Sequence, residues 1–211
     1  MDDSATRRVL IAGGGIAGLA VRRALHQRGI PSLTLERRGE QADAGLAINL
    51  PGNAVRALSQ FGLLDLLRAV GAPVRRREYR TERGRLLFAV DETAFWGTEA
   101  GPHCLRRADL LRLLQDDLAP DDIRRGIAIA TVRQDPQGVT AELADGSTEK
   151  GGLLVGADGV HSAVRRSLFG EQAHSVQAST PGLGVMKRQL WLASIAAPRV
   201  CSPNRLRRTA E

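Results

Sequence analysis

Three glycines near the start of the chain have the spacing of a turn that binds a dinucleotide. Gly13, Gly15 and Gly18 form a Gly-x-Gly-x-x-Gly pattern directly after the apolar run of residues 9–12. The first glycine would permit a tight turn, the second would let the backbone approach a pyrophosphate, and the third would let a helix pack closely on the strand. An ordinary glycine-rich turn is the alternative reading of the pattern.

The residues after these glycines favour the nucleotide reading. A helix beginning at Ile16 and Ala17 would point its free N–H groups and partial positive charge at the phosphates. Glu36 ends a second apolar run, residues 33–35, and its carboxylate could accept hydrogen bonds from an adenosine ribose, with Arg37 beside it. Because an acid at this place disfavours a 2′-phosphate, the pattern predicts FAD or NAD rather than NADP.

A second candidate turn lies at residues 156–165 and follows the apolar run 153–155. There Asp158, followed by Gly159, could hold a ribose or ribityl hydroxyl, and Ser162 could cap the next helical turn. Arg165 could meet a phosphate or Asp158 itself. From the residues alone, a capped helix start with a structural ion pair explains this stretch equally well.

The elements that must position these residues alternate between strand and helix. A strand, a glycine turn, a helix and a second strand make a right-handed βαβ unit, and the sheet should therefore be parallel. We expect strands at 9–12, 33–36 and 153–155, helices at 16–28, 53–60, 63–70 and 107–118, and hairpins at 75–90 and 139–147. Residues 37–52 read as a loop, Asn53 as a helix cap, and residues 160–168 as one or two helical turns.

Composition narrows the class of protein. The 211 residues are 43% hydrophobic and 25% charged, as in soluble globular proteins, and no stretch is long enough to span a membrane. Two distant cysteines argue against a disulfide framework or a zinc site and favour the cytoplasm. The net charge of +7 comes largely from residues 171–211, with six basic and two acidic residues, and no nucleic-acid-binding module accompanies them.

Together these motifs resemble the flavoprotein monooxygenases related to para-hydroxybenzoate and salicylate hydroxylases. The resemblance rests on Gly13–Gly18 with Glu36, on the segment 45–63, on Arg107-Ala108-Asp109-Leu110 and on residues 156–165, in the family's order. It implies an α/β, Rossmann-type FAD-binding fold of the glutathione-reductase kind over residues 1–170. Residues 75–100 would begin a substrate-domain sheet, and residues 171–211 would be an irregular basic tail.

The resemblance also implies roles for individual residues. Gly13, Gly15 and Gly18 would hold the FAD pyrophosphate, Glu36 the adenosine ribose, and Arg107 the FAD from the start of its helix. Asp158 and Gly159 would serve the region between FAD and the NAD(P)H path. Relatives hydroxylate an aromatic or similar small substrate with dioxygen, and the flavin supplies the chemistry, so no catalytic side chain is expected.

Several other side chains are less informative. His103 and His161 read as surface or capping residues rather than catalysts. Phe88, Phe95 and Trp96 could wall an apolar pocket, although core packing explains them as well.

The sequence also departs from the family's pattern. The family's third motif, a Gly-Asp pair, does not occur in it, and the Arg, Pro and Ser content after Gly170 is that of a translation that has lost its frame. We therefore expect a truncated enzyme with weak flavin binding, poor solubility and doubtful activity. The alternatives are a non-catalytic nucleotide-binding remnant or partner subunit, and an NAD-dependent dehydrogenase. Substrate identity, NADH against NADPH and the oligomeric state are not readable.

Overall fold

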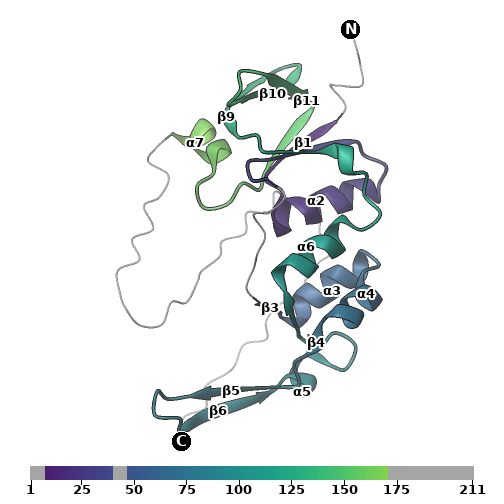
Figure 1. The fold of residues 1–211 in the computed structure, drawn as a ribbon, viewed down its shortest axis with the longest axis vertical. Helices are drawn as coiled ribbons and strands as arrows, with labels where there is room; N and C mark the ends of the chain where they lie inside the picture. Colours follow the sequence, from purple (N-terminus) through teal and green to yellow (C-terminus); the bar gives the residue numbers. More distant parts are fainter. Residues whose placement is uncertain (1–7, 40–46, 171–211) are drawn as a thin grey trace, which may run out of the picture. The chain divides into compact units, whose positions relative to one another are not determined.

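The described part of the chain contains a four-stranded parallel sheet (Figure 1). The computed structural model describes residues 8–39 and 47–170. In it the strands run in the order β12 (Leu153–Gly156), β1 (Val9–Ala12), β2 (Ser32–Glu36) and β8 (Ile123–Arg125). Each neighbouring pair is parallel, which confirms the predicted sheet. Strand β1 is fully buried, as its unbroken apolar run requires.

The first βαβ unit has the predicted form. Helix α2 (Ile16–His26) follows the glycine turn and ends two residues before the expected Arg28. Gly29 then adopts a φ of +64°, the left-handed conformation expected of a glycine after a helix.

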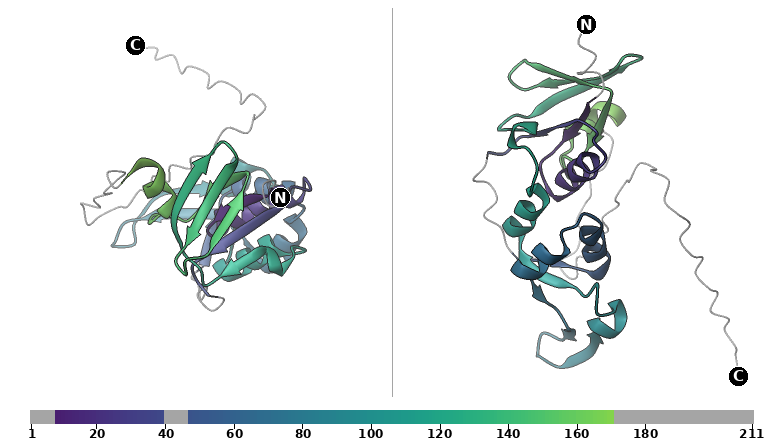
Figure 2. Two further views of the ribbon diagram at one scale, coloured as in Figure 1. Left: turned by 90° about the horizontal axis from the view of Figure 1, so that it is seen from above. Right: turned by 90° about the vertical axis from the view of Figure 1, so that its right-hand side faces the viewer.

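The parallel sheet is covered on both faces (Figure 2). One face packs on an antiparallel sheet of β9 (Ile129–Asp135), β10 (Gly138–Leu143) and β11 (Thr148–Gly151), of which only the β10–β11 hairpin was predicted. Leu10, Leu33 and Leu35 meet the alternating inward residues of β10 there. Helix α2 covers the other face and packs against α6 (Arg107–Gln115), which ends before the predicted Leu118.

A second core lies among the helices. It contains Leu19 of α2, four leucines of α6, and apolar residues of α3 (Gly52–Gln60) and α4 (Leu64–Val70). Pro51, not Asn53, precedes the first turn of α3, so the predicted cap was wrong. The Asn53 side chain instead accepts a hydrogen bond from the neighbouring Ala54 N–H at 2.9 Å.

A small antiparallel sheet corrects the predicted loop at 37–52. Strand β3 (Ala47–Leu50) pairs with β7 (His103–Arg106), which also pairs with β4 (Ala72–Pro73). Its partner is distant in the sequence, so no local pattern marked it as a strand. Residues 40–46 of that stretch lie outside the described residues.

The remaining described elements are one hairpin and short helices. Strands β5 (Arg76–Arg80) and β6 (Leu86–Asp91) form the predicted hairpin, followed by the short helix α5 (Glu92–Trp96). Helix α7 (Ala163–Phe169) follows β12, and η2 (Pro120–Asp122) precedes β8. None of the helices in the described ranges could cross a membrane.

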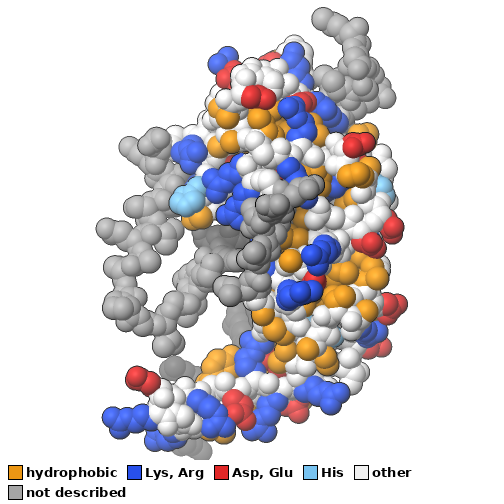
Figure 3. Space-filling view, in the orientation of Figure 1, with side chains coloured by type: hydrophobic (Ala, Val, Ile, Leu, Met, Phe, Trp, Pro, Cys, Tyr) orange, Lys and Arg blue, Asp and Glu red, His pale blue; other side chains and the backbone are white. Residues whose placement is uncertain are grey.

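All described residues belong to one compact unit of residues 1–174. The predicted boundary at residue 170 stays a prediction, and the predicted tail at 171–211 lies outside the described residues. On the face in Figure 3, basic, acidic and apolar side chains are interspersed.

Candidate functional site

The two candidate turns, far apart in the sequence, meet at one edge of the parallel sheet. Strand β12 lies beside β1 with Gly156 opposite Ala12, and the Ala157 N–H donates to the Ala12 carbonyl at 2.8 Å. Gly13 has a φ of +101°, and a Cβ built on it would lie 2.5 Å from the Ala157 carbonyl oxygen. Only glycine fits there, since both the backbone conformation and the neighbouring turn exclude a side chain.

Gly15 and Gly18 are glycines for different reasons. A Cβ on Gly18 would lie 1.8 Å from the Gly13 carbonyl oxygen, so this glycine is needed for the loop to close on its own helix. Gly15 has an ordinary φ of −77°, and among the described residues a Cβ on it would meet nothing within 4 Å. Neither the conformation nor the packing of Gly15 requires glycine, and the space in front of it is open.

That open space lies at the start of α2. Gly15 is the N-cap residue, and neither a side-chain cap nor an acidic residue occupies the first turn, which begins with Ile16 and Ala17. The first N–H groups of an α-helix have no partner within the helix. The N-terminal end of α2 therefore presents hydrogen-bond donors and a partial positive charge, which suit a phosphate group.

Glu36 lies beside this loop, at the carboxyl end of β2. Its carboxylate accepts hydrogen bonds from the N–H groups of Gly14 and Arg38, the latter at 2.8 Å. The side chain is half-buried, whereas Arg37 next to it is exposed. Gly14 was not among the predicted site residues, although the run of three glycines was a signal for it.

Among the described residues, one carboxylate oxygen of Asp158 has hydrogen-bond partners and the other has none. Oδ2 accepts hydrogen bonds from the N–H groups of Ala163 at 2.7 Å and Val164 at 3.2 Å, at the start of α7. Oδ1 is buried and has no hydrogen-bond partner among the described residues. Gly159 follows with a φ of +82°. A buried carboxylate oxygen normally has a donor, so Asp158 fits a ligand that brings a hydroxyl group.

The side chains after Asp158 have structural partners. The Ser162 hydroxyl accepts from the Arg165 N–H at 2.9 Å, which confirms the predicted cap. The Arg165 guanidinium donates to the Val160 carbonyl at 2.7 Å. No bond between Arg165 and Asp158 is recorded within the described residues.

Arg107 is the first residue of α6 and is half-buried. Its neighbour Arg106 belongs to an ion pair with Asp109, with Nε and Oδ2 2.7 Å apart, and Arg112 approaches the same carboxylate at 2.8 Å. Hydrogen bonds from Arg106 hold the pKa of the Asp109 carboxyl below its ordinary value. The first turn of α6 is thus fixed by its own charged side chains.

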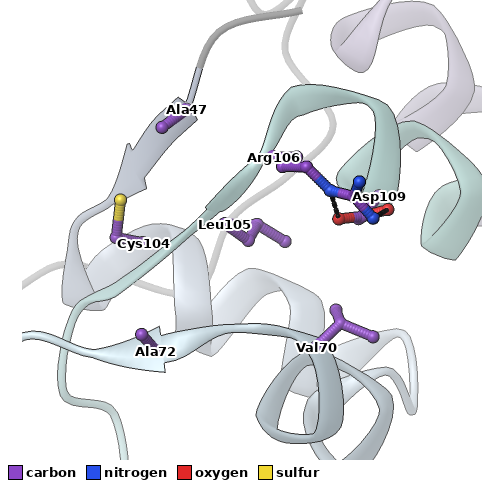
Figure 4. Close-up of a pocket in the computed structure, with 7 residues that line it drawn as sticks. All are labelled: Ala47, Val70, Ala72, Cys104, Leu105, Arg106 and Asp109. Atoms are coloured by element: carbon purple, nitrogen blue, oxygen red, sulfur yellow. Dashed lines mark hydrogen bonds and ion pairs between the residues drawn. The ribbon is translucent and has the colours of Figure 1, made fainter.

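A shallow pocket lies next to this turn (Figure 4). Its lining is mostly apolar, with the Arg106–Asp109 pair at one side: Ala47, Val70, Ala72, Cys104, Leu105, Arg106 and Asp109. Among the described residues, Phe88, Phe95 and Trp96 do not line it. Phe88 is 53% exposed and stacks on Tyr79 with ring centroids 4.3 Å apart, and Phe95 is 69% exposed, so neither packs in the core.

The two histidines differ from each other. His161 is exposed, as predicted, and its carbonyl accepts from Arg166 at 3.0 Å. His103 is buried in β7, with Nδ1 2.9 Å from the Gly101 carbonyl oxygen, so of the two predicted roles, surface or capping, the surface role was wrong for it.

Comparison with known proteins places this geometry among flavoproteins. The chain is 37% identical to the 3-amino-4-hydroxybenzoate 2-monooxygenase PtnB3 of Streptomyces platensis over 175 residues, which are 78% of this chain and 42% of that protein. It is 32% identical to an FAD-dependent urate hydroxylase of Klebsiella pneumoniae over 77% of this chain and 43% of that protein. The chain thus spans about two fifths of the length of these relatives.

Solved structures agree with the curated relatives. Klebsiella pneumoniae HpxO, solved in complex with FAD and uric acid, superimposes with a TM-score of 0.66 at 31% identity, covering 75% of this chain and 41% of that one. The p-nitrophenol 4-monooxygenase PnpA of Pseudomonas putida shares the fold, with a TM-score of 0.71 at 24% identity over 78% of this chain and 44% of that one.

The family defined by the FAD binding domain matches residues 6–204 and so continues past Gly170. With its glycine turn, its acid at the end of β2 and its Asp-Gly turn meeting at one sheet edge, the chain belongs to the FAD binding domain family of flavoprotein monooxygenases and hydroxylases.

Proposed function

We propose that the chain is the FAD-binding part of a monooxygenase that hydroxylates an aromatic or similar small organic compound with NAD(P)H and dioxygen. The open space before Gly15, at an uncapped helix end beside Glu36, carries the proposal. A glycine that neither conformation nor packing explains is best explained by a bound group that approaches the backbone.

The proposal assigns each residue a task. Gly15, Ile16 and Ala17 would donate N–H groups to the pyrophosphate, Gly13 and Gly18 would hold the loop closed, and Glu36 would exchange its bond to Gly14 for ribose hydroxyls. Oδ1 of Asp158 would accept a hydrogen bond from the same ligand, and Arg107 would add a positive charge.

Bound FAD would supply the redox chemistry with dioxygen, and the chain's own residues would bind and orient it. The relatives' activities on an aminohydroxybenzoate and on urate support a small, planar substrate. The Cys104 thiol is free, which fits a reducing compartment such as the cytoplasm.

The test is a titration of the full 211-residue chain with FAD, followed by flavin fluorescence. Replacing Gly15 by Ala should change the urea midpoint of unfolding only by the modest N-cap preference for glycine, because the added methyl group meets no atom of the described residues. FAD affinity should fall on the order of tenfold or more, since forcing a methyl group into close contact costs about 1–3 kcal/mol.

Gly101→Ala is the matched control. Gly101 also has an ordinary φ, and a Cβ on it would meet only one atom, at 3.9 Å. This variant should bind FAD like the original chain. Equal affinities for FAD in the Gly15 and Gly101 variants would contradict the proposed site, and NAD binding tighter than FAD binding would favour a dehydrogenase instead.

A further inference from the structure

Two adjacent arginines of α2 are buried, although the predicted site does not use them. Arg22 is 2% exposed and Arg23 is 9% exposed. Arginine is rarely buried to this extent unless its charge has partners, because removing a guanidinium from water is costly. Burial lowers the pKa of Arg22, and Asp122 acts in the opposite direction. The contacts of the two guanidinium groups show which segments they bind.

Arg23 holds the carboxyl end of α6. Its Nη1 donates to the Asp116 carbonyl at 2.6 Å and lies 3.4 Å from the Leu113 carbonyl oxygen. The last carbonyls of a helix lack partners within it and carry a partial negative charge. The buried Arg23 guanidinium therefore binds the carboxyl end of α6, whereas Arg107 is at the other end of the same helix.

Arg22 holds the segment that follows α6. Its guanidinium donates to the Ala119 carbonyl, and Nη2 lies 3.6 Å from a carboxylate oxygen of Asp122. Asp122 ends η2 and leads directly into β8, which pairs with β2. Both the end of α6 and its connection to the sheet are thus bound by one turn of α2.

Helices α2 and α6 pack against each other (Figure 1), and each has a stripe of side chains that belongs to the shared core. On α2 the stripe runs through Ile16, Leu19, Ala20 and Arg23, at helical spacing. On α6 the same spacing joins Arg107 to Leu110, Leu111 and Leu114, which belong to one core with Leu19. Each stripe spans seven residue steps, or about 10 Å.

This match connects the buried pair to the nucleotide site. Counted back seven residues from the Arg23 contact, α2 reaches Ile16, next to Gly15, and α6 reaches its first turn, which contains Arg107. Leucine contacts alone tolerate sliding between helices, whereas hydrogen bonds to particular carbonyls fix the axial position.

We infer that Arg22 and Arg23 are positioning residues that set the axial register of α6 on α2 and so place Arg107 at the phosphate-binding end of α2. This inference rests on the proposed function, because it treats Arg107 as part of the FAD site. Arg22 and Arg23 themselves would not touch the cofactor.

A double-mutant cycle on FAD affinity in the full chain tests it. Arg107→Ala should weaken FAD binding on the order of tenfold, as expected for the loss of a charged hydrogen bond. Arg23→Met should weaken it similarly, and the double variant should be no weaker than Arg107→Ala within about twofold. Arg23→Lys keeps a cation at the α6 end and should recover most of the affinity.

Arg28→Met is the control, because Arg28 is exposed just after the same end of α2 and its guanidinium donates back to the Ala24 carbonyl of α2 at 2.9 Å. It should leave FAD binding unchanged. If the losses from Arg107→Ala and Arg23→Met multiply in the double variant, Arg23 does not act through Arg107 and the inference is overturned.

A second readout separates this inference from the proposed function. If the original chain does not bind FAD, the proposed function fails. Amide hydrogen exchange then tests whether Arg22 and Arg23 hold α6 in place. Exchange in α6 should then rise in Arg23→Met but not in Arg28→Met, while exchange in β1 stays the same. Unchanged protection of α6 from exchange in Arg23→Met would overturn the inference that Arg23 holds α6.

Discussion

At the scale of single residues, the glycines of the first turn show what spacing can and cannot predict. The pattern predicted a tight turn at Gly13, backbone open to a ligand at Gly15 and close packing at Gly18, and among the described residues an added Cβ collides at Gly13 and Gly18 but not at Gly15. The spacing did not predict that Ala157, from a distant turn, is the neighbour of Gly13. The free oxygen of Asp158 was equally unreadable, since burial and satisfied bonds are properties of the folded chain.

Asp109 provides a residue-scale prediction about pH. Because hydrogen bonds from Arg106 lower the pKa of the folded-state carboxyl, its contribution to stability is full above the unfolded pKa of about 3.9. That contribution is lost as the pH falls through the lower, folded-state pKa. Asp109→Asn should therefore reduce the urea midpoint of unfolding at neutral pH.

The difference from the original chain should shrink as the pH drops below about 4. Urea unfolding at a series of pH values, followed by circular dichroism, measures it. Asp121→Asn, which changes an exposed carboxylate in η2, is the control for the removal of one negative charge. A deficit in Asp109→Asn that is constant down to pH 2 would contradict the assignment.

At the scale of elements, sequence patterns predicted the helices and strands whose partners lie close in the sequence. The β1–α2–β2 unit and the β5–β6 hairpin were found nearly as expected, since their partners are close in the sequence. Strands β3 and β8 were missed because each pairs with a distant segment, β7 and β2 respectively. The ends of α2 and α6 were placed two and three residues too late, since a helical pattern does not show where tertiary contacts stop a helix.

Helix α7 allows an element-scale prediction that separates capping from ligand binding. Ser162→Ala removes the acceptor for the Arg165 N–H and should cost about 1 kcal/mol of stability, as at other helix N-caps. FAD affinity should remain within about twofold, because Asp158 keeps its bonds to Ala163 and Val164. Urea unfolding and FAD titration of the same samples give the two values.

Ser59→Ala is the control for this comparison, because Ser59 is an exposed helical serine of α3. Asp158→Ala should lose both stability and FAD affinity, since it removes the hydrogen bonds to Ala163 and Val164 together with Oδ1. If Ser162→Ala weakens FAD binding as much as Asp158→Ala does, the two roles of this turn are not separable.

At the scale of the whole molecule, the strand order explains how the site is assembled and leaves an edge strand that can pair with another chain. The position of β12 beside β1 brings the Asp-Gly turn to the glycine turn, and no sequence pattern in either strand specified that neighbour. Among the described strands, β12 pairs with β1 alone, so it is an edge of the sheet. Leu153, at its start, is 57% exposed.

An apolar edge strand is a template for pairing with another chain. We therefore predict that the full chain self-associates as its concentration rises, and that Leu153→Lys reduces this association. A charge on an edge strand opposes pairing, and the change should leave the urea midpoint nearly unaltered because the side chain is largely in solvent. Sedimentation velocity at increasing protein concentration measures the effect.

Val70→Lys, at a 49% exposed position of α4, is the control for added charge alone. An equal reduction by both substitutions would show that net charge, rather than the β12 edge, governs association.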